Sequence, residues 1–592
     1  LKFFIYSIVI FITLSFSSES NPIYLDSSFS DTQRVEDLLS KMTIEEKVAQ
    51  MCQYVGLNYL SSENESSLTA EILNSDSKAS YKGFLKKDIA QMVVDGKIGS
   101  FLHVLQPKES NMLQALALKS RLKIPLIIGI DAIHGNGMVK GTTVYPSPIS
   151  ISSSFTDSLS YVVGLQTAKE IRAAGSHWAF TPNIDVLRDP RWGRVGETFG
   201  EDPLLVSNMG VSMIKGLQET NKVIACAKHF IAGSEPINGL NSSPMDISER
   251  NLREIYLKPF KKAVESGVYS IMAAHNELNG VPCHMNKYLM TEILRDEFKF
   301  QGFIVSDWMD IERIHTLHKT AENPKDASFL SVDAGMDMHM HGPYFLEYIT
   351  ELVKENKISK KRIDESARKI LLAKFKLGLF EDPFIDLTKV NKNLFTKEHQ
   401  NTSLEIARKS IVLLQNKKGN LPLIKSKKTR ILVTGPNANN HSILGDWTKP
   451  QPEENVVTIF EGIKKIGSQK GFEVDFHDSN SDILNITPTD ILSTVSIAKD
   501  YDYVFVVVGD NSLRHLKNKK TAGENMARAN LNLAGNQLNL VKSLDKLSNE
   551  LIVIYVNGKP IAEPWIAENI NSVIEAWEPG SFGGQAVGEI IF

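Results

Sequence analysis

Five apolar stretches of this sequence end in residues that can ionise or form hydrogen bonds. The run IPLIIGI is followed by Asp131, HWAFTPNI by Asp185, VIACA by Lys228 and His229, SIMAA by His275 and Asn276, and GFIVS by Asp307. Trp308 follows Asp307 directly, and the stretch RDPRWGR supplies Arg194. Carboxylates, cationic donors and an indole suit a sugar, because its hydroxyls need several hydrogen-bond partners and its C–H faces pack on aromatic rings.

Hydrolysis of a glycosidic bond is a reaction that such residues could perform. It needs two carboxyl groups in different protonation states. Asp307 suits the ionised group, because nearby Lys, Arg or His would lower its pKa. The second group must stay protonated in a less polar setting, and the residues alone leave it unidentified. The sequence has no obvious Ser-His-Asp set and no CxxC or HExxH pattern, so we expect neither a metal nor a cofactor.

The elements that would position these residues are strands of a parallel sheet. Between about residues 90 and 345, strand-like apolar runs alternate with longer amphipathic stretches, which indicates repeated β/α units. In a (β/α)8 barrel the carboxyl ends of all strands meet on one face, where active sites are built. We therefore expect residues 22–385 to form a (β/α)8 TIM-like barrel. Strand capping alone could explain one or two of the polar residues, but five in succession favour a site.

The second half repeats the alternation after a polar segment, residues 386–404, which we interpret as a linker. Candidate strands are residues 431–434, 472–476, 503–508, 551–556 and 572–576. Five strands with helical segments between them predict an open α/β three-layer sandwich over residues 405–592.

Composition bounds the class of protein. A chain of 592 residues is too long for one core, and its net charge of −3 with scattered Lys and Arg argues against nucleic acid as a partner. Residues 1–18 resemble a secretory signal peptide. Sequons at five asparagines fit export: Asn64, Asn241, Asn401, Asn440 and Asn485. We expect a secreted or lysosomal glycoprotein that does not span a membrane once the signal is removed. Its oligomeric state stays open.

Nine motifs in consistent order carry a resemblance to a known family. They are DAIHG, RDPRWGR, KHF, ISERNLREIYLKPF, NELNGVPCHMN and GFIVSDW, followed by IVLLQNKKGNLPL, VNGKPI and EAWEPGSFGGQAVGEIIF. The chain resembles glycoside hydrolase family 3, the β-glucosidase and β-xylosidase family, over about residues 30–592. The resemblance implies a retaining, exo-acting β-glucosidase that removes non-reducing terminal β-D-glucosyl residues through a covalent glycosyl-enzyme.

The resemblance also implies roles for single residues. Asp307 matches the nucleophile, and Trp308 would form a wall of the pocket. The residues that match the family's sugar-binding positions are Asp131, Arg194, Lys228 and His229. The family's acid/base is a Glu ahead of a block that matches RANLNLAGNQ, residues 528–537, which makes Glu524 the acid/base here. A shorter loop would instead put His515 at that position and leave an impaired enzyme.

Several positions depart from the family pattern. Asn241 and Ser242 stand where Asp and Arg are usual, His275 replaces a usual Tyr, and Ala534 replaces a Pro. A glycan on Asn241 would lie close to the pocket. Family members continue past GEIIF, so we expect a C-terminally truncated sandwich with an exposed edge and marginal stability.

Other functions stay open beside the β-glucosidase. A β-xylosidase or a β-N-acetylhexosaminidase could use the same scaffold. The hexosaminidase branch resembles this chain less, because the loop IAGSEPINGLNSS after KHF lacks the expected His. A catalytically impaired sugar-binding homologue is the alternative outside the enzymes. We expect His134, Asp185 and Asp189 to hold loops and Asp310 to begin a helix.

Overall fold

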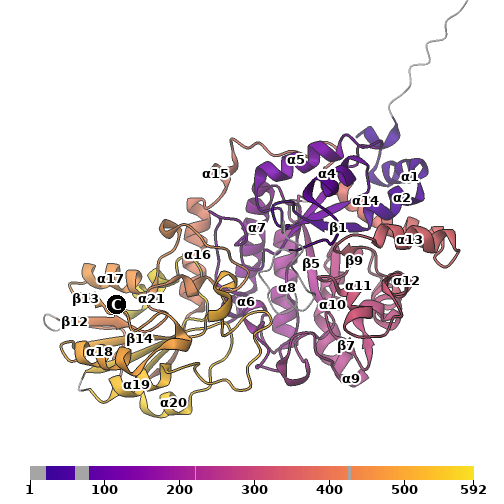
Figure 1. The fold of residues 1–592 in the computed structure, drawn as a ribbon. Coiled ribbons are helices and arrows are strands. Elements are labelled where there is room, and N and C mark those ends of the chain that lie inside the picture. Colours follow the sequence, from indigo (N-terminus) through magenta and orange to yellow (C-terminus); the bar gives the residue numbers. More distant parts are fainter. Residues whose placement is uncertain (1–21, 61–78, 221, 425–428, 548) are drawn as a thin grey trace, which may run out of the picture.

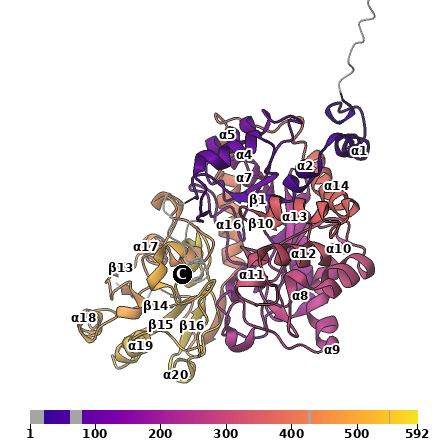
Figure 2. The same cartoon turned by 45° about the vertical axis from the view of Figure 1, so that its right-hand side comes forward.

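The computed structural model describes residues 22–60, 79–220, 222–424, 429–547 and 549–592. The predicted signal peptide and the sequon at Asn64 lie outside the described residues. Figure 1 shows two α/β units beside one another, a barrel coloured indigo to magenta and a second unit coloured orange to yellow. Figure 2 shows from another side that the two units pack against each other along one edge.

The first unit is a nearly closed barrel of eight parallel strands. In spatial order they are β10 (His339–Met340), β1 (Cys52–Val55), β2 (Ser100–Leu102), β3 (Ile127–Ile130), β4 (Trp178–Ala179), β5 (Ile224–Phe230), β6 (Ser270–Ala273) and β9 (Phe303–Val305). A parallel bridge between Val305 and Met338 brings the last strand beside the first. The predicted (β/α)8-like barrel is therefore confirmed, and the five apolar runs contain β3, β4, β5, β6 and β9. Asp131, His275 and Asp307 lie just after their strands, whereas Lys228 and His229 lie within β5 and Asp185 lies in the loop beyond β4.

The barrel interior is filled by side chains. Trp178 on β4 packs edge-on against Phe303 on β9, with ring centroids 5.0 Å apart, and its indole N–H donates to Ser270 Oγ on β6 at 2.7 Å. These strands are not neighbours, so the contacts cross the barrel. This packed interior leaves the rim as the place for a pocket, as in other barrels of this kind.

Amphipathic helices surround the barrel. They include α1 (Asp31–Lys41), α2 (Ile44–Gln50), α4 (Lys86–Val94), α5 (Pro107–Ala117), α7 (Asp157–Ala174), α8 (Pro203–Gln218), α10 (Leu257–Glu265), the π-helix η6 (Tyr288–Glu297), α11 (Asp310–Thr316), α12 (Pro324–Ala334), α13 (Phe345–Lys354) and α14 (Lys360–Lys376). Helix α8 shows why they begin where they do: Asp202 accepts hydrogen bonds from two backbone N–H groups of the first turn, and Pro203 takes the first helical position.

The second unit is built on a mixed six-stranded sheet. Its spatial order is β11 (Val412–Asn416), β16 (Ser572–Glu575), β15 (Glu550–Val556), β14 (Tyr503–Gly509), β12 (Arg430–Thr434) and β13 (Glu473–Phe476). Five of these strands match the predicted ones. Strand β11 was not predicted; it pairs antiparallel with β16 and makes the sheet mixed.

Helices cover both faces of this sheet, which confirms three layers. On one face lie α17 (Ile459–Gln469) and α21 (Gly583–Ile591), and on the other lie α18 (Pro488–Ala498), α19 (Gln537–Asp545) and α20 (Pro564–Asn569). Along β14, Phe505 and Val507 belong to the first core, whereas Val504, Val506 and Val508 belong to the second. Burial on both faces explains the near-continuous apolar run of this strand.

The two units are joined through α15 (Val390–Asn393) and α16 (Lys397–Ser410), which lie in or overlap the predicted linker. Hydrogen bonds between main-chain atoms hold the two units together. Ser581 N donates to Val144 O at 2.9 Å, and Gly523 N donates to Gly193 O at 2.8 Å. The side chain of Val144 belongs to the core of the second unit. Within the described residues, no helix has both the length and the apolar character to cross a bilayer.

Close backbone contact between α17 and α21 generates a stability prediction. A Cβ at Gly462 would lie 1.8 Å from the carbonyl oxygen of Gly584, so only glycine fits unless the helices separate. We expect Gly462→Val to lower the free energy of unfolding by about 1–3 kcal/mol through overpacking, seen as a lower thermal midpoint. Ser468→Ala, at an exposed position of the same helix, is the control. An unchanged midpoint for Gly462→Val would contradict this packing.

Candidate active site

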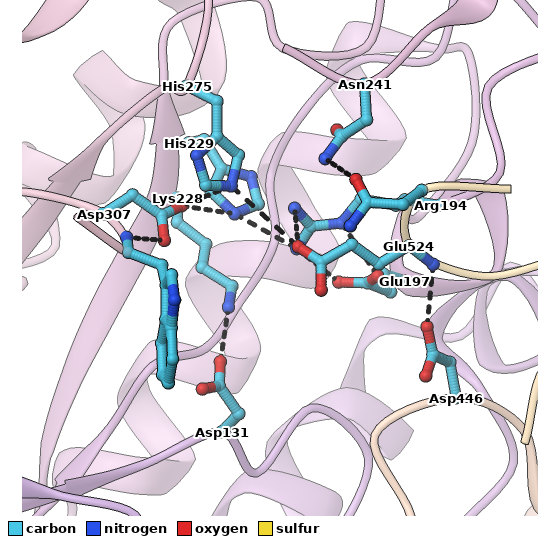
Figure 3. Close-up of polar contacts among 12 residues, drawn as sticks. Asp131, Arg194, Glu197, Lys228, His229, Asn241, His275, Asp307, Asp446 and Glu524 are labelled. Carbon is cyan, nitrogen blue, oxygen red and sulfur yellow. Dashed lines mark hydrogen bonds and ion pairs between the residues drawn. The ribbon is translucent and has the colours of Figure 1, made fainter. Parts of the chain in front are cut away.

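A pocket of about 700 Å³, including solvent at its mouth, opens at the barrel rim against the second unit. All seven residues selected from the sequence line it: Asp131, Arg194, Lys228, His229, Asp307, Trp308 and Glu524. Six come from the barrel and Glu524 comes from the second unit. Figure 3 shows the Asp307 and Glu524 side chains directed toward the same imidazole group.

Asp307 is buried and lies two residues after β9, where two hydrogen bonds of main-chain N–H groups fix its position. Its N–H donates to Nε2 of His284 at 2.9 Å, and its Oδ1 accepts from the N–H of Trp308 at 2.6 Å. Its other oxygen, Oδ2, lies 3.1 Å from Nε2 of His275 and 3.6 Å from Nε2 of His229. One carboxylate oxygen is therefore held by the backbone and the other faces the pocket.

Asp131 forms a buried ion pair at the end of β3. Lys228 Nζ donates to Oδ1 at 2.7 Å, and His103 Nε2 lies 2.9 Å from Oδ2. Burial alone would raise the pKa of Asp131, but Lys228 and His103 outweigh it and lower the pKa to about 2. Asp131 is thus an ionised acceptor held by two donors.

His229 is oriented by a buried carboxylate behind it. Its Nδ1 lies 2.8 Å from Oδ2 of Asp185, and its Nε2 lies 3.2 Å from an Arg194 guanidinium nitrogen. Burial lowers the pKa of His229 well below its ordinary value and raises that of Asp185 to about 7. Asp185 therefore positions a neutral imidazole, in keeping with its expected loop-holding role. Asp189 pairs with Arg191 at 2.7 Å and also holds its own loop.

Glu524 is clamped between two arginines on a loop ahead of α19. Its Oε1 lies 3.1 Å from Arg194 of the barrel, and its Oε2 accepts from Arg514 of the second unit at 2.9 Å. Glu197 holds the Arg194 guanidinium through two contacts of 2.9 Å, and Asp446 holds Arg514 at 2.8 Å. Asp446 also accepts from the N–H of Glu524 at 2.9 Å. The carboxylate is thus fixed from both sides of the boundary between the units (Figure 3).

The pKa directions of the two facing carboxyl groups are the reverse of our expectation. Burial raises the pKa of Asp307; His275 opposes the shift and Asp310 adds to it. Burial would also raise the pKa of Glu524, but Arg194 and Arg514 outweigh it and hold the pKa well below its ordinary value. The reason is that the cations near the pocket contact other carboxylates and not Asp307. Lys228 pairs with Asp131, and Arg194 pairs with Glu197 and Glu524.

Aromatic side chains form the walls of the pocket. Trp308 packs edge-on against His341, with ring centroids 4.2 Å apart. Trp447 of the second unit carries the Arg514 guanidinium on its face, 3.3 Å from the ring centroid. Tyr59 also lines the pocket. Such faces suit the C–H surface of a sugar.

The mouth of the pocket is bridged by two asparagines. Asn241 Nδ2 donates to Oδ1 of Asn525 at 3.0 Å, and Asn241 Oδ1 accepts from the indole N–H of Trp192 at 3.1 Å. This hydrogen bond joins the two units at Asn241, where the resemblance implied an Asp. A glycan on Asn241 would be attached through the same nitrogen that makes this bond.

Some pocket residues were not selected from the sequence. His103 directly follows β2, so it obeys the strand-end pattern, but the apolar run before it is only Phe101 and Leu102. Arg514 begins the short 3-10 helix η10 (Arg514–Lys519) and Trp447 comes from a loop, and neither segment has a periodic signal. His515, the alternative acid/base, is not among the described residues that line the pocket, whereas Glu524 is.

Asp310 was expected to begin a helix and His134 to hold a loop. Asp310 is the first residue of α11, as expected, but it also bonds to His275. His134 bonds to the carbonyl groups of Tyr145 and Asp446, which is a structural role.

Among the described residues, one group of acidic and imidazole side chains is close enough together to surround a cation: His275, Asp307 and Asp310. Their polar atoms are already paired with one another, and Arg313 donates to Asp310 at 2.7 Å. An arginine inside the group makes it an ion-pair network, and we assign no metal to it. The three cysteines, Cys52, Cys226 and Cys283, are all buried free thiols.

Curated relatives include both glucosidases and xylosidases. A "Beta-xylosidase" of Formosa agariphila is 38% identical over 535 residues, covering 84% of this chain and 72% of the relative. The "Periplasmic beta-glucosidase" of Salmonella typhimurium is 31% identical over 590 residues, covering 94% and 72%. The "Lysosomal beta glucosidase" of Dictyostelium discoideum is 30% identical over 587 residues, covering 94% and 70%.

Solved structures and family models agree with these relatives. The β-glucosidase EmGH1 of Erythrobacter marinus superposes with a TM-score of 0.84 at 30% identity, covering 97% of this chain and 77% of that one. A β-glucosidase of Listeria innocua in complex with glucose gives 0.82 at 30% identity, covering 95% and 74%. Residues 43–373 match the Glycosyl hydrolase family 3 N terminal domain, and residues 411–592 match its C-terminal domain. The chain therefore belongs to glycoside hydrolase family 3 and is a glycoside hydrolase.

Proposed function

We propose that this glycoside hydrolase is a retaining, exo-acting β-glucosidase that releases non-reducing terminal β-D-glucosyl residues. The observation that carries the proposal is the pair of carboxyl groups around one nitrogen. Nε2 of His275 lies 3.1 Å from Asp307 and 3.9 Å from Glu524. A gap bridged by a single imidazole nitrogen is compatible with the ~5–5.5 Å separation of retaining enzymes.

In the proposed reaction Asp307 attacks the anomeric carbon while Glu524 protonates the leaving oxygen. A glycosyl-enzyme forms, and Glu524 then takes a proton from the water that releases the sugar. The sugar hydroxyls would exchange hydrogen bonds with the paired residues at the pocket floor: Asp131, Arg194, Lys228 and His229. Trp308 would pack on the ring.

Glu524 must gain a proton before it can act as an acid. In the empty site its two arginines favour the carboxylate. That state suits the second half of the reaction, in which Glu524 is a base. The first half needs a proton source close to Oε1.

A β-xylosidase is the second candidate, because the 38% identical relative carries that name. A β-N-acetylhexosaminidase has less support, since the described loop after β5, residues 231–243, contains no histidine. A catalytically impaired protein also has less support, because Glu524 and not His515 lines the pocket. We further propose a secreted or lysosomal location, supported by the periplasmic and lysosomal relatives. The exposed sequons at Asn401 and Asn485 fit a glycoprotein.

Turnover of a panel of p-nitrophenyl β-glycosides tests the proposal directly. We expect the glucoside to give the highest kcat/KM. Asp307→Ala should lower kcat by several orders of magnitude, because removing the nucleophile removes the covalent route. A 2-deoxy-2-fluoro glucoside should label the peptide that contains Asp307. A preference for the xyloside would move the assignment to a β-xylosidase, and a label elsewhere would overturn the mechanism.

Removal of Glu524 should separate the two halves of the reaction. In Glu524→Ala, a substrate with a good leaving group such as 2,4-dinitrophenyl β-glucoside should still form the glycosyl-enzyme, whose hydrolysis then becomes slow. Azide needs no base, so it should restore turnover and yield β-glucosyl azide, detected by NMR. Absence of rescue, or an α-azide product, would argue against Glu524 as acid/base.

The contact between the loops of Arg194 and Glu524 yields a third test. A Cβ at Gly193 would lie 2.1 Å from the carbonyl oxygen of Gly523. Gly193→Ala should push the Glu524 loop away and lower kcat about 10²-fold, because a displacement of about 1 Å can have that effect. The thermal midpoint should change little. The control is Glu201→Ala, an exposed position in the same segment between β4 and α8. Full activity of Gly193→Ala would contradict a site whose geometry depends on the contact between the two units.

A further inference from the structure

His275 holds a proton next to the proposed nucleophile. Its Nδ1 lies 2.7 Å from Oδ2 of Asp310, and its Nε2 lies 3.1 Å from Oδ2 of Asp307. A ring nitrogen without a proton and an ionised carboxylate are both acceptors, so they do not face one another at 3.1 Å unless a proton lies between them. The pair Asp307–His275 therefore shares one proton, and Asp310 fixes the ring from behind.

His229, the other imidazole near Asp307, cannot supply that proton. Its Nδ1 donates to Asp185, and its Nε2 accepts from Arg194. The ring of His229 is stacked beside that of His275, with centroids 6.0 Å apart. His284 cannot supply it either, because its Nε2 accepts the N–H of Asp307.

The groups that face His275 come from every element around it. They are Asp307 after β9, Asp310 and Arg313 on α11, His229 on β5, His284 after the β7–β8 hairpin (Glu277–Leu278 and Val281–Pro282), and Glu524 from the second unit. Burial lowers the pKa of His275, but the carboxylates of Asp307 and Asp310 outweigh burial and raise it. The imidazolium form is thus favoured while Asp307 carries its charge.

Nε2 of His275 also lies 3.9 Å from Oε1 of Glu524. A small side-chain movement or one water closes this gap. Building on the proposed function, we propose that His275 carries a proton from the Asp307 side of the pocket to Glu524 in each turnover. The family usually has a tyrosine here, so this device would belong to this chain.

The charge on Asp307 controls the transfer. When Asp307 attacks, a bond forms from its oxygen to the anomeric carbon and the glycosidic C–O bond breaks. The carboxylate becomes a neutral ester, so His275 loses the charge that held its proton. The proton passes to Glu524 and from there to the leaving oxygen, and neutral His275 remains bonded to Asp310.

The second half returns the proton. Water adds its oxygen to the anomeric carbon, and the proton it loses moves through Glu524 to Nε2 of His275. The ester bond to Asp307 breaks, and the restored carboxylate again faces the imidazolium. The net change is the addition of one water to the glycoside.

Leaving-group dependence tests the relay separately from the proposed function. Wild-type turnover of 2,4-dinitrophenyl β-glucoside tests hydrolysis itself. In His275→Gln we expect kcat/KM for phenyl β-glucoside, which needs a proton on its leaving group, to fall about 10²-fold. The value for 2,4-dinitrophenyl β-glucoside should fall less than about tenfold. Equal losses on both substrates would show that His275 only holds the structure and would overturn the relay.

The pH profile gives a second readout. The relay needs protonated His275, and the pKa of this group is raised, so the alkaline limb of the activity profile should fall only as the pH rises above about 6.5, the ordinary pKa of histidine. His275→Tyr, with the residue usual in the family, should shift this alkaline limb upward. His441→Tyr, at a half-buried position of the second unit, should leave it unchanged. An unshifted limb in His275→Tyr would overturn the relay.

Discussion

The carboxylate of Glu524 lies between two guanidinium groups that come from different units of the chain. Arg194 reaches it from the barrel, and Arg514 reaches it from the second unit with Asp446 behind. A buried charge is tolerated only when it is paired and hydrogen-bonded. The network therefore stabilises the docked arrangement and also sets the position of Glu524. Neither unit alone has a complete pocket.

The same constraint explains why so many charges gather in a buried place. Each cation of the pocket floor has its own carboxylate, as Lys228 has Asp131 and Arg194 has Glu197. This pairing leaves Asp307 with His275 as its nearest side-chain donor among the described residues that line the pocket. Burial and pairing, and not the number of cations nearby, decide which group holds a proton.

Much of the arrangement could be predicted from short sequence patterns. Polar residues after apolar runs identified five barrel strands, and the seven residues selected for the site all line one pocket. At β1, β2 and β10, polar residues such as Gln53, Ser100 and His339 break the sequence into apolar runs of one or two residues, so no strand signal stands out, and His103 was missed with β2. Strand β11 was missed because it follows α16 directly and exposes Leu413 and Leu414, so it lacks the alternation of a half-buried strand.

The protonation states could not be predicted in this way. They depend on which carboxylate each cation contacts, and those partners are far apart in the sequence. Asp310 lies 35 residues from His275, and Arg194 lies 330 residues from Glu524. The departure at His275 was visible in the sequence, but its partners became apparent only when α11 and the second unit were placed around it.

Asp131 on the floor of the pocket already has two partners. Lys228 and His103 both pair with it, so an incoming hydroxyl exchanges contacts with this carboxylate. A site whose buried polar groups depend on the ligand rejects an analogue that lacks one hydroxyl, because those groups are left unpaired. Here Asp131 keeps its contacts with Lys228 and His103 when a hydroxyl is missing. A hexose and the pentose without its hydroxymethyl group would then be distinguished by ring packing and shape, and not by a buried group left unpaired.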